Sequence, residues 1–240
     1  MCKYAEELVK LGISLKSDKY DLLICPLRGA LKPTYYLKTM GVIENEVNWL
    51  PFTGATSGHY DKLIITYLKE ILKWVSPEQD LFTISIIDTA IGGNGSNKLA
   101  DLFVELKNSF FPNSNWVVKF YLVHYAKEPS SINYIESIRS KSSVNLMFNV
   151  YRYQVNNLIV EDWDSAIGLN VEFKSNSVII KNSIQEGRII IMDSNKIFVV
   201  DTPEISHYVD VLIASNISDA IITHPEFTFV KNVWQDYINR

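Results

Sequence analysis

The chain has 240 residues, and its 47% hydrophobic content is enough for one large domain or for a core with an accessory part. A formal net charge of −4 and the lack of a Lys/Arg run argue against a protein that grips nucleic acid by neutralising phosphates. No apolar run approaches the roughly 18 residues of a membrane span, and the N-terminus has no basic region followed by an apolar one, so we expect a soluble cytoplasmic protein.

The first predicted elements are a helix and a short buried strand. Residues 3–15 form an amphipathic pattern that predicts a helix ending near Gly12 and packing on a sheet. The apolar run Leu22–Cys25 predicts a strand, and the turn Pro26-Leu27-Arg28-Gly29 follows it before a helix-like stretch. The Arg28 guanidinium is well placed there to pair with a phosphate oxygen, because its fork of N–H donors matches that geometry. An arginine at the surface or at the edge of the core is the alternative interpretation.

A second strand and a longer amphipathic helix are predicted next, at 46–52 and 60–75. The polar stretch 53–59 between them carries two glycines and His59. This stretch is either a flexible lid that excludes water from a ligand or an ordinary exposed loop, and both interpretations stay open.

The most informative stretch is 81–106. The apolar, β-branched run Phe82–Ile87 predicts a buried strand that Asp88 closes. Ser96 or Asn97 can cap the helix that follows. Between strand and helix lie three glycines, Gly92, Gly93 and Gly95. Backbone N–H groups of such a turn and the N-terminus of the helix can hold a phosphate, and the acid can face ribose hydroxyls or a divalent cation. A plain connection is the alternative, since the turn is neither a Walker A loop nor a G-x-G-x-x-G fingerprint.

Two strand–turn–helix units, one with Arg-Gly and one with Asp…Gly-Gly-x-Gly-Ser, resemble the type I phosphoribosyltransferase family over roughly 21–127. PLRGA looks like the P-x-R-G-G turn of that family, which holds the pyrophosphate of phosphoribosyl pyrophosphate (PRPP). IIDTAIGGNGS looks like its PRPP loop, which holds the ribose 5-phosphate. The family's loop has two acids, and this chain keeps one: Thr89 replaces the second acid or Ile87 replaces the first. In the former register Gly92 stands where 6-oxopurine members carry a general-base Asp.

The resemblance implies a set of site residues. Asp88 is the expected catalytic carboxylate, which would contact ribose hydroxyls or the shell of a Mg²⁺ ion bound with PRPP. The pyrophosphate would lie on Leu27, Arg28 and Gly29. The 5-phosphate would lie on Thr89, Ala90, Ile91, Gly92, Gly93, Asn94, Gly95 and Ser96. We expect no metal site made by the protein alone, since Cys2 and Cys25 have no metal-ligand spacing.

Further strands are predicted at Trp116–Tyr125 and Val144–Val150, so the chain reads as βα units of a parallel sheet. The acidic segment 161–164 follows. Its Asp162 and Trp163 could line the face where an acceptor base stacks, although a helix N-terminus rich in acids is the simpler alternative.

The last third changes character. Short strands at 171–173, 177–181, 188–192 and 196–200, separated by polar turns, predict antiparallel hairpins, and a helix is predicted at 205–214. The expected fold class is α/β: a mostly parallel central sheet with flanking helices in a phosphoribosyltransferase-like core at 1–150, with a β-rich accessory part or hood at 151–240. The binding crevice should lie at the carboxyl ends of the first and third strands.

Three functions remain open at this point. The first is a phosphoribosyltransferase that transfers phosphoribosyl to a nitrogen nucleophile and releases pyrophosphate. The second is a catalytically impaired relative that senses PRPP or a nucleotide, and the third is a protein-interaction domain on the same fold. The expected partner is a phosphorylated sugar or nucleotide, with no nucleic acid and no membrane. A homodimer is implied by the resemblance, and the C-terminal part could bind a protein.

Overall fold

The computed structural model describes residues 3–27, 29–44, 46–52, 61–73, 75, 77, 80–90, 93–125, 144–153, 169–174, 177–182, 189–191 and 225–239. Its helices are α1 (Lys3–Ser17), α2 (Leu31–Thr39), α3 (Asp61–Leu72), α4 (Asn94–Phe110) and α8 (Pro225–Ile238). Its strands are β1 (Leu22–Leu27), β2 (Asn48–Pro51), β3 (Phe82–Ala90), β4 (Trp116–Tyr125), β5 (Asn145–Tyr153), β6 (Leu169–Lys174), β7 (Ser177–Asn182) and β8 (Ile189–Ile191). No helix within these ranges is long and apolar enough to cross a membrane.

The central sheet has five strands in the order β2-β1-β3-β4-β5, and every neighbouring pair is parallel. All residues of β1 are buried, as are nearly all of β3, which is why these strands read as continuous apolar runs. The predicted α/β class with a parallel sheet and flanking helices is therefore confirmed.

The position of β1 between β2 and β3 creates a topological switch point. The chain leaves β1 toward β2 on one side and returns to β3 on the other side. In open α/β sheets, ligands bind in the crevice outside the carboxyl ends of the two strands where the direction reverses. The end of β1 and the end of β3 are these positions here.

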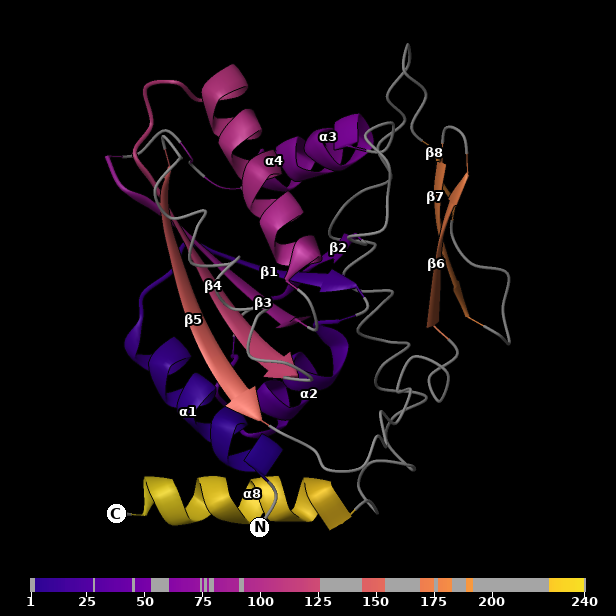
Figure 1. Ribbon diagram of the computed structural model, residues 1–240. Helices are drawn as coiled ribbons and strands as arrows, with labels where there is room; N and C mark the ends of the chain where they lie inside the picture. Colours follow the sequence, from indigo (N-terminus) through magenta and orange to yellow (C-terminus); the bar gives the residue numbers. More distant parts are fainter. Residues whose placement is uncertain are drawn as a thin grey trace.

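Helices cover both faces of this sheet (Figure 1). The helices α1 and α2 lie on one face, where α1 contacts β4 and β5, while α3 and α4 lie on the other. The predicted packing of the first helix on the sheet is thus confirmed. The core between the layers holds bulky side chains that are fully buried, among them Trp49, Trp116, Tyr36, Tyr67, Phe82, Phe103 and Phe120.

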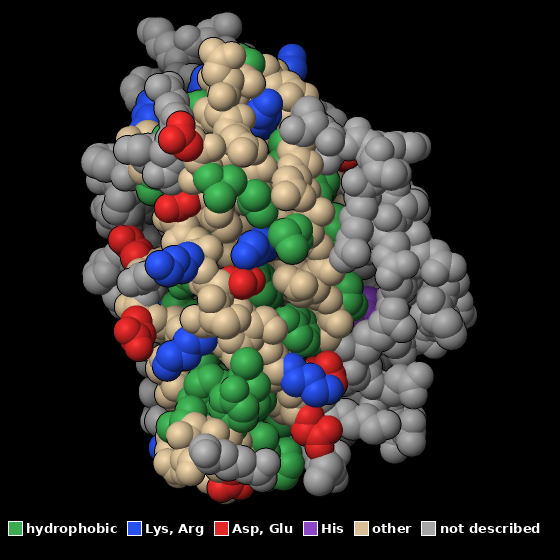
Figure 2. All heavy atoms as spheres, turned by 90° about the vertical axis from the view of Figure 1, so that its left-hand side faces the viewer, with side chains coloured by type: hydrophobic (Ala, Val, Ile, Leu, Met, Phe, Trp, Pro, Cys, Tyr) green, Lys and Arg blue, Asp and Glu red, His purple; other side chains and the backbone are tan. Residues whose placement is uncertain are grey.

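The helix α8, which was not predicted, packs beneath α1 (Figure 1). Val230 and Trp234 are its buried residues, and the Trp234 ring lies close to Gly12 of α1. Tyr237 and Ile238, near the end of α8, are about half exposed, at 45% and 50%. On the face shown in Figure 2, hydrophobic side chains gather toward the lower part, and acidic and basic side chains lie around them as well as above.

The strands β6, β7 and β8 form a second, antiparallel sheet, in which β7 pairs with both neighbours. The predicted hairpins at 171–173, 177–181 and 188–192 are therefore confirmed. The predicted strand at 196–200 and the predicted helix at 205–214 lie outside the described residues, and the boundary at residue 150 stays a prediction.

Candidate functional site at the switch point

The carboxyl ends of β1 and β3 bring the two predicted turns together. Gly29 lies directly after β1, and Asp88 lies in the last third of β3. A Cβ atom at position 29 would collide with the Asp88 Oδ1 atom and would lie 3.3 Å from the carbonyl oxygen of Thr89. Position 29 therefore requires glycine, because the carboxyl group fills the space that a side chain would take.

The first turn also includes Leu27 and Arg28. Leu27 is the last residue of β1, and its side chain is buried in the core. The predicted role of Leu27 can therefore concern only its backbone. Arg28 lies outside the described residues, so its predicted contact with a phosphate stays a prediction.

The second turn is shorter than the sequence suggested. The expectation that Asp88 closes its strand is wrong, because β3 continues to Ala90. The neighbouring strand β4 extends as far as Tyr125, and Asp88, Thr89 and Ala90 each have a partner in it. Thr89 and Ala90 thus lie in the sheet, while Ile91 and Gly92 lie outside the described residues.

The start of α4 also differs from the expectation. Its N-cap is Gly93 rather than Ser96 or Asn97, and no side chain caps it. Gly93 adopts a left-handed conformation, φ 76° and ψ −8°, which turns the chain so that the helix already begins at Asn94. Asn94, Gly95 and Ser96 consequently form the first turn of α4, where backbone N–H groups lack partners within the helix.

Asp88 is a buried carboxyl group, only 8% exposed. Its Oδ1 atom accepts a hydrogen bond of 2.8 Å from the backbone N–H of Thr89. Burial raises the pKa of Asp88 from 3.8 to about 7, and the hydrogen bond from Thr89 partly opposes that rise. Near neutral pH the group is therefore divided between its protonated and ionised forms, and a cation beside it would favour the carboxylate.

The first turn of α4 carries two buried polar side chains. Ser96 is 2% exposed and Asn97 is 4% exposed. Among the residues that the structure describes, the Ser96 Oγ atom and both polar atoms of the Asn97 carboxamide have no hydrogen-bond partner. Together with the uncapped helix end, they make this turn suited to an anionic group.

The first turns of α3 and α4 lie side by side. The Lys98 ammonium, next to Asn97 in sequence, lies 2.8 Å from the carboxylate of Asp61, the first residue of α3. The stretch 53–59, for which a lid and an ordinary loop were both open, precedes α3 and lies outside the described residues, as do Asp162 and Trp163.

The site offers little to a metal ion by itself. Within the described ranges, no group of three His, Cys, Asp or Glu side chains is placed to hold one. Asp88 can supply a single carboxylate, whose Oδ1 atom already accepts from Thr89. This fits Mg²⁺ bound mainly through the phosphates of a ligand, since Mg²⁺ commonly uses one or two protein carboxylates and keeps several waters.

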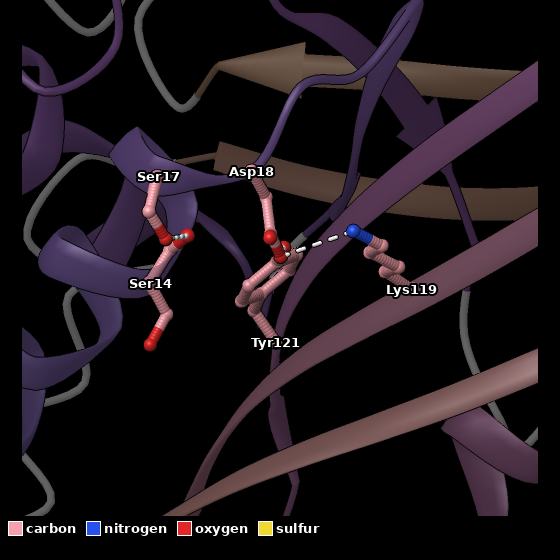
Figure 3. Close-up of polar contacts among 5 residues, drawn as sticks. All are labelled: Ser14, Ser17, Asp18, Lys119 and Tyr121. Carbon is pink, nitrogen blue, oxygen red and sulfur yellow. Dashed lines mark hydrogen bonds and ion pairs between the residues drawn. The ribbon is translucent and has the colours of Figure 1, made fainter.

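A second polar cluster joins the end of α1 to the central sheet (Figure 3). The Tyr121 hydroxyl of β4 donates to the Asp18 carboxylate just after α1, and the Lys119 ammonium lies 3.2 Å from the same oxygen. Asp18 lies between α1 and β1, whereas Lys119 and Tyr121 lie within β4. The cluster attaches the end of α1 to β4 and includes neither Gly29 nor Asp88.

No protein-family model matches this chain, and no curated protein matches it. Among solved structures, the chain is similar to the xanthine-guanine-hypoxanthine phosphoribosyltransferase of Helicobacter pylori. The identity is 11%, the match covers 67% of this chain and 92% of that chain, and the TM-score is 0.31. This likeness is distant, and the α/β class stated above rests on the strand order and pairing of the chain itself.

Proposed function

We propose that the chain binds PRPP with Mg²⁺ at the switch point and transfers its phosphoribosyl group to a nitrogen nucleophile. The observation that supports this most is the close approach of Gly29 and Asp88, beside the uncapped first turn of α4. The two turns lie at the same edge of the sheet, so each of them can hold one end of an elongated sugar phosphate.

In this proposal each group of residues contacts a different part of PRPP. The turn of Leu27, Arg28 and Gly29 would hold the pyrophosphate through backbone N–H groups and the guanidinium of Arg28. The first turn of α4 would hold the 5-phosphate through its N–H groups and the Ser96 hydroxyl. Asp88 would accept hydrogen bonds from ribose hydroxyls or from the water shell of Mg²⁺.

The reaction needs no covalent intermediate with the protein. The nitrogen forms a bond to C1 of the ribose, the bond from C1 to the pyrophosphate oxygen breaks, and pyrophosphate leaves with that electron pair. The proton on the nitrogen passes to solvent or to the leaving group. The protein would act by positioning the reactants and by stabilising the charge that develops on them.

A second candidate function is binding of PRPP or a nucleotide without catalysis. The observation that favours it is the single carboxylate: Asp88 is followed by Thr89, which continues β3 in the place of a second acid. A protein of this kind would bind a partner differently when PRPP or a nucleotide is bound.

Calorimetry with PRPP and Mg²⁺ tests both functions against the plain interaction domain. We expect one PRPP to bind each chain, and the absence of binding would contradict both functions. Release of pyrophosphate with a panel of nitrogenous bases then separates the enzyme from the sensor, because only the enzyme turns PRPP over. Gly93→Val is the matching variant: a branched side chain at a left-handed position beside the phosphate should abolish binding.

A further inference from the structure

We infer that the outer edge of β5 binds a second copy of this chain, whose own β5 adds to it antiparallel about a two-fold axis at Asn149. The two five-stranded sheets would then form one continuous sheet. This inference goes beyond the proposed function, because β5 carries none of the residues proposed to bind PRPP. It begins from a difference between β2 and β5, the two edge strands of the central sheet.

The two edge strands differ in length and composition. The strand β2 has four residues and ends at Pro51, so it offers another strand little to pair with. The strand β5 has nine residues, pairs with β4 over its whole length, and contains no Pro, Gly, Lys, Asp or Glu. Proteins protect a sheet edge with short strands, prolines and charged residues, and β5 has only Arg152. An edge of this kind is suited to the addition of a strand.

The described part of the chain leaves this edge open to a partner. Among the strands that the structure describes, none pairs with the outer side of β5. The strand lies at the left-hand edge of the central sheet in Figure 1, and Figure 2 views the molecule from this side, where described residues form the surface over most of its height. Met147 of β5 is apolar and yet 42% exposed.

The sequence of β5 is complementary to itself. An antiparallel pair centred on Asn149 aligns the whole strand, with Asn145 opposite Tyr153 of the copy. Asn149 would lie opposite Asn149 of the copy, and their carboxamides can exchange hydrogen bonds. Met147 would lie opposite Tyr151 of the copy, where sulfur and ring make a favourable contact that covers the exposed methionine.

No like charges meet along the paired strands in this arrangement. Arg152 is the charged residue of β5, and it would lie opposite Leu146 of the copy. The two arginines would then be six residues apart along the pairing, which is about 20 Å. A second β5 can therefore pair along its full length without charge repulsion.

The spacing of the helices also fits a second copy. On one face of the sheet α2 contacts β1 and β3, and α1 contacts β4 and β5, so each helix covers two strands. A two-fold axis perpendicular to the sheet would place α1 of the copy on this same face, over the next two strands. Two strand spacings are about 10 Å, the distance at which helices pack side by side. The second copy thus continues the helix spacing of the single chain, which an unrelated strand has no reason to match.

The first test is sedimentation velocity on the natural chain and on charge variants at the axis. We expect the natural chain to sediment as a dimer, at twice the chain mass of 27.5 kDa. Asn149→Lys and Asn149→Glu each place two like charges opposite each other, so each should raise the Kd of the dimer about tenfold or more. An equal mixture of the two variants should recover the dimer, because lysine then faces glutamate. Recovery also shows that both variants are folded.

Asn145→Lys is the matched control. Asn145 is an asparagine of the same strand and the same face, and it lies far from the axis, opposite Tyr153 of the copy. Lysine at this position meets no like charge, so the Kd of the dimer should stay within a factor of about three of the natural value.

Cysteine substitutions test the register independently of charge. Cys25 is buried, so the remaining cysteine, Cys2, is replaced by serine. Asn149→Cys should then form a disulfide between two copies on mild oxidation, since residues directly opposite bring their Cβ atoms to about 4.5–5.5 Å. Asn145→Cys should not, because its two copies would be about 27 Å apart along the pairing.

The inference fails in several distinct ways. A natural chain that sediments as a monomer would overturn it. A dimer that persists in both Asn149 variants, or that Asn145→Lys disrupts equally, would place the interface or its axis elsewhere and overturn it too. Equal crosslinking at 149 and 145 would indicate random collision and would likewise contradict it. PRPP binding is measured separately by calorimetry, so either proposal can fail while the other stands.

Discussion

The Asp88 carboxylate of β3 lies against the α-carbon of Gly29, so that the turn after β1 and the end of β3 share one packed contact at the switch point. A side chain at position 29 would therefore force the Asp88 carboxylate or the turn to move. This contact couples the segment proposed to hold pyrophosphate to the carboxylate proposed to face ribose or Mg²⁺.

Replacing Gly29 with alanine should damage both stability and binding. The new Cβ atom would force Asp88 or the turn to move, and such overpacking typically costs about 1–3 kcal/mol. A displaced turn should also lower the affinity for PRPP by about tenfold or more, because small errors in the position of binding groups are costly. Chemical denaturation and calorimetry measure the two effects.

Gly12→Ala is the control for this prediction. A Cβ atom at position 12 would also be crowded, at 3.2 Å from the Leu37 Cδ2 atom and 3.3 Å from the Val42 Cγ2 atom. These contacts lie in the packing around α1 and not at the proposed binding site. The variant should lower stability and leave the affinity for PRPP unchanged. Equal affinity losses for both variants would mean that Gly29 has no special relation to the ligand.

Asp88→Asn should stabilise the free protein in a manner that depends on pH. Asparagine can still accept the Thr89 N–H bond, but it carries no charge to bury. Because the folded pKa of about 7 exceeds the ordinary 3.8, the native state binds more protons than the unfolded state between these values, and stability falls as pH rises through them. The penalty is absent below about pH 4 and complete above about pH 7.

The measurement is urea denaturation of both proteins at pH 4 and pH 8. The free energies of unfolding should agree at pH 4, and the variant should be more stable at pH 8 by on the order of 2–4 kcal/mol. The same variant should bind PRPP with Mg²⁺ more weakly, since the carboxylate is gone. A difference in stability that is the same at both pH values would show that burial of this charge is not the cause.

Gly93→Ala and Gly41→Ala form a second matched pair. Both glycines are left-handed, with φ of 76° and 68°. An alanine at either position should cost about 1–2 kcal/mol of stability. Only Gly93 lies at the proposed phosphate turn, so only its variant should lose affinity for ribose 5-phosphate. Calorimetry on both variants measures these affinities. An unchanged affinity of the Gly93 variant for ribose 5-phosphate would argue against this turn as the phosphate site.

The Asp18 cluster gives a prediction about stability alone. The Tyr121 hydroxyl donates to a charged carboxylate, whereas the Tyr67 hydroxyl donates to the neutral Trp49 carbonyl oxygen at 3.1 Å. Hydrogen bonds to charged groups contribute more, so Tyr121→Phe should cost about 1.5–3 kcal/mol and Tyr67→Phe about 0.5–1.5 kcal/mol. Denaturation midpoints test this order, and PRPP binding should not change in either variant. The reverse order would mean that the carboxylate contributes little.

Much of the fold could be predicted because the signals were local. The strand β4 occupies the predicted residues 116–125, and α1 begins at the predicted residue 3. Strong apolar periodicity and turn residues determined these elements. A crevice was expected at the carboxyl ends of the first and third strands. The first predicted strand, β1, does pair with β3, and this pairing places Gly29 against Asp88.

The errors arose where distant contacts decide the structure. The strand β3 continues past Asp88 because Thr89 and Ala90 pair with β4. The length of β4 cannot be predicted from the local pattern in 82–90. The helix α8 was missed although Pro225 is a favourable first helical residue and Phe229, Val230, Val233 and Trp234 recur at helical spacing. Its packing against α1 joins two segments far apart in the sequence.

The site was predicted less completely than the fold. Asn97 was considered only as a helix cap, because its burial could not be foreseen from its polarity. Around the axis of α4, Asn97 lies opposite Leu99, Leu102 and Leu106, so the apolar periodicity of this helix does not predict its burial.

The structure of the complex with ribose 5-phosphate tests the central claim most directly. The phosphate is predicted to lie within hydrogen-bond distance of the backbone N–H groups in the first turn of α4 and of the Ser96 hydroxyl, with the sugar directed toward Asp88. A phosphate bound elsewhere, or a sugar directed away from Asp88 and Gly29, would contradict the account.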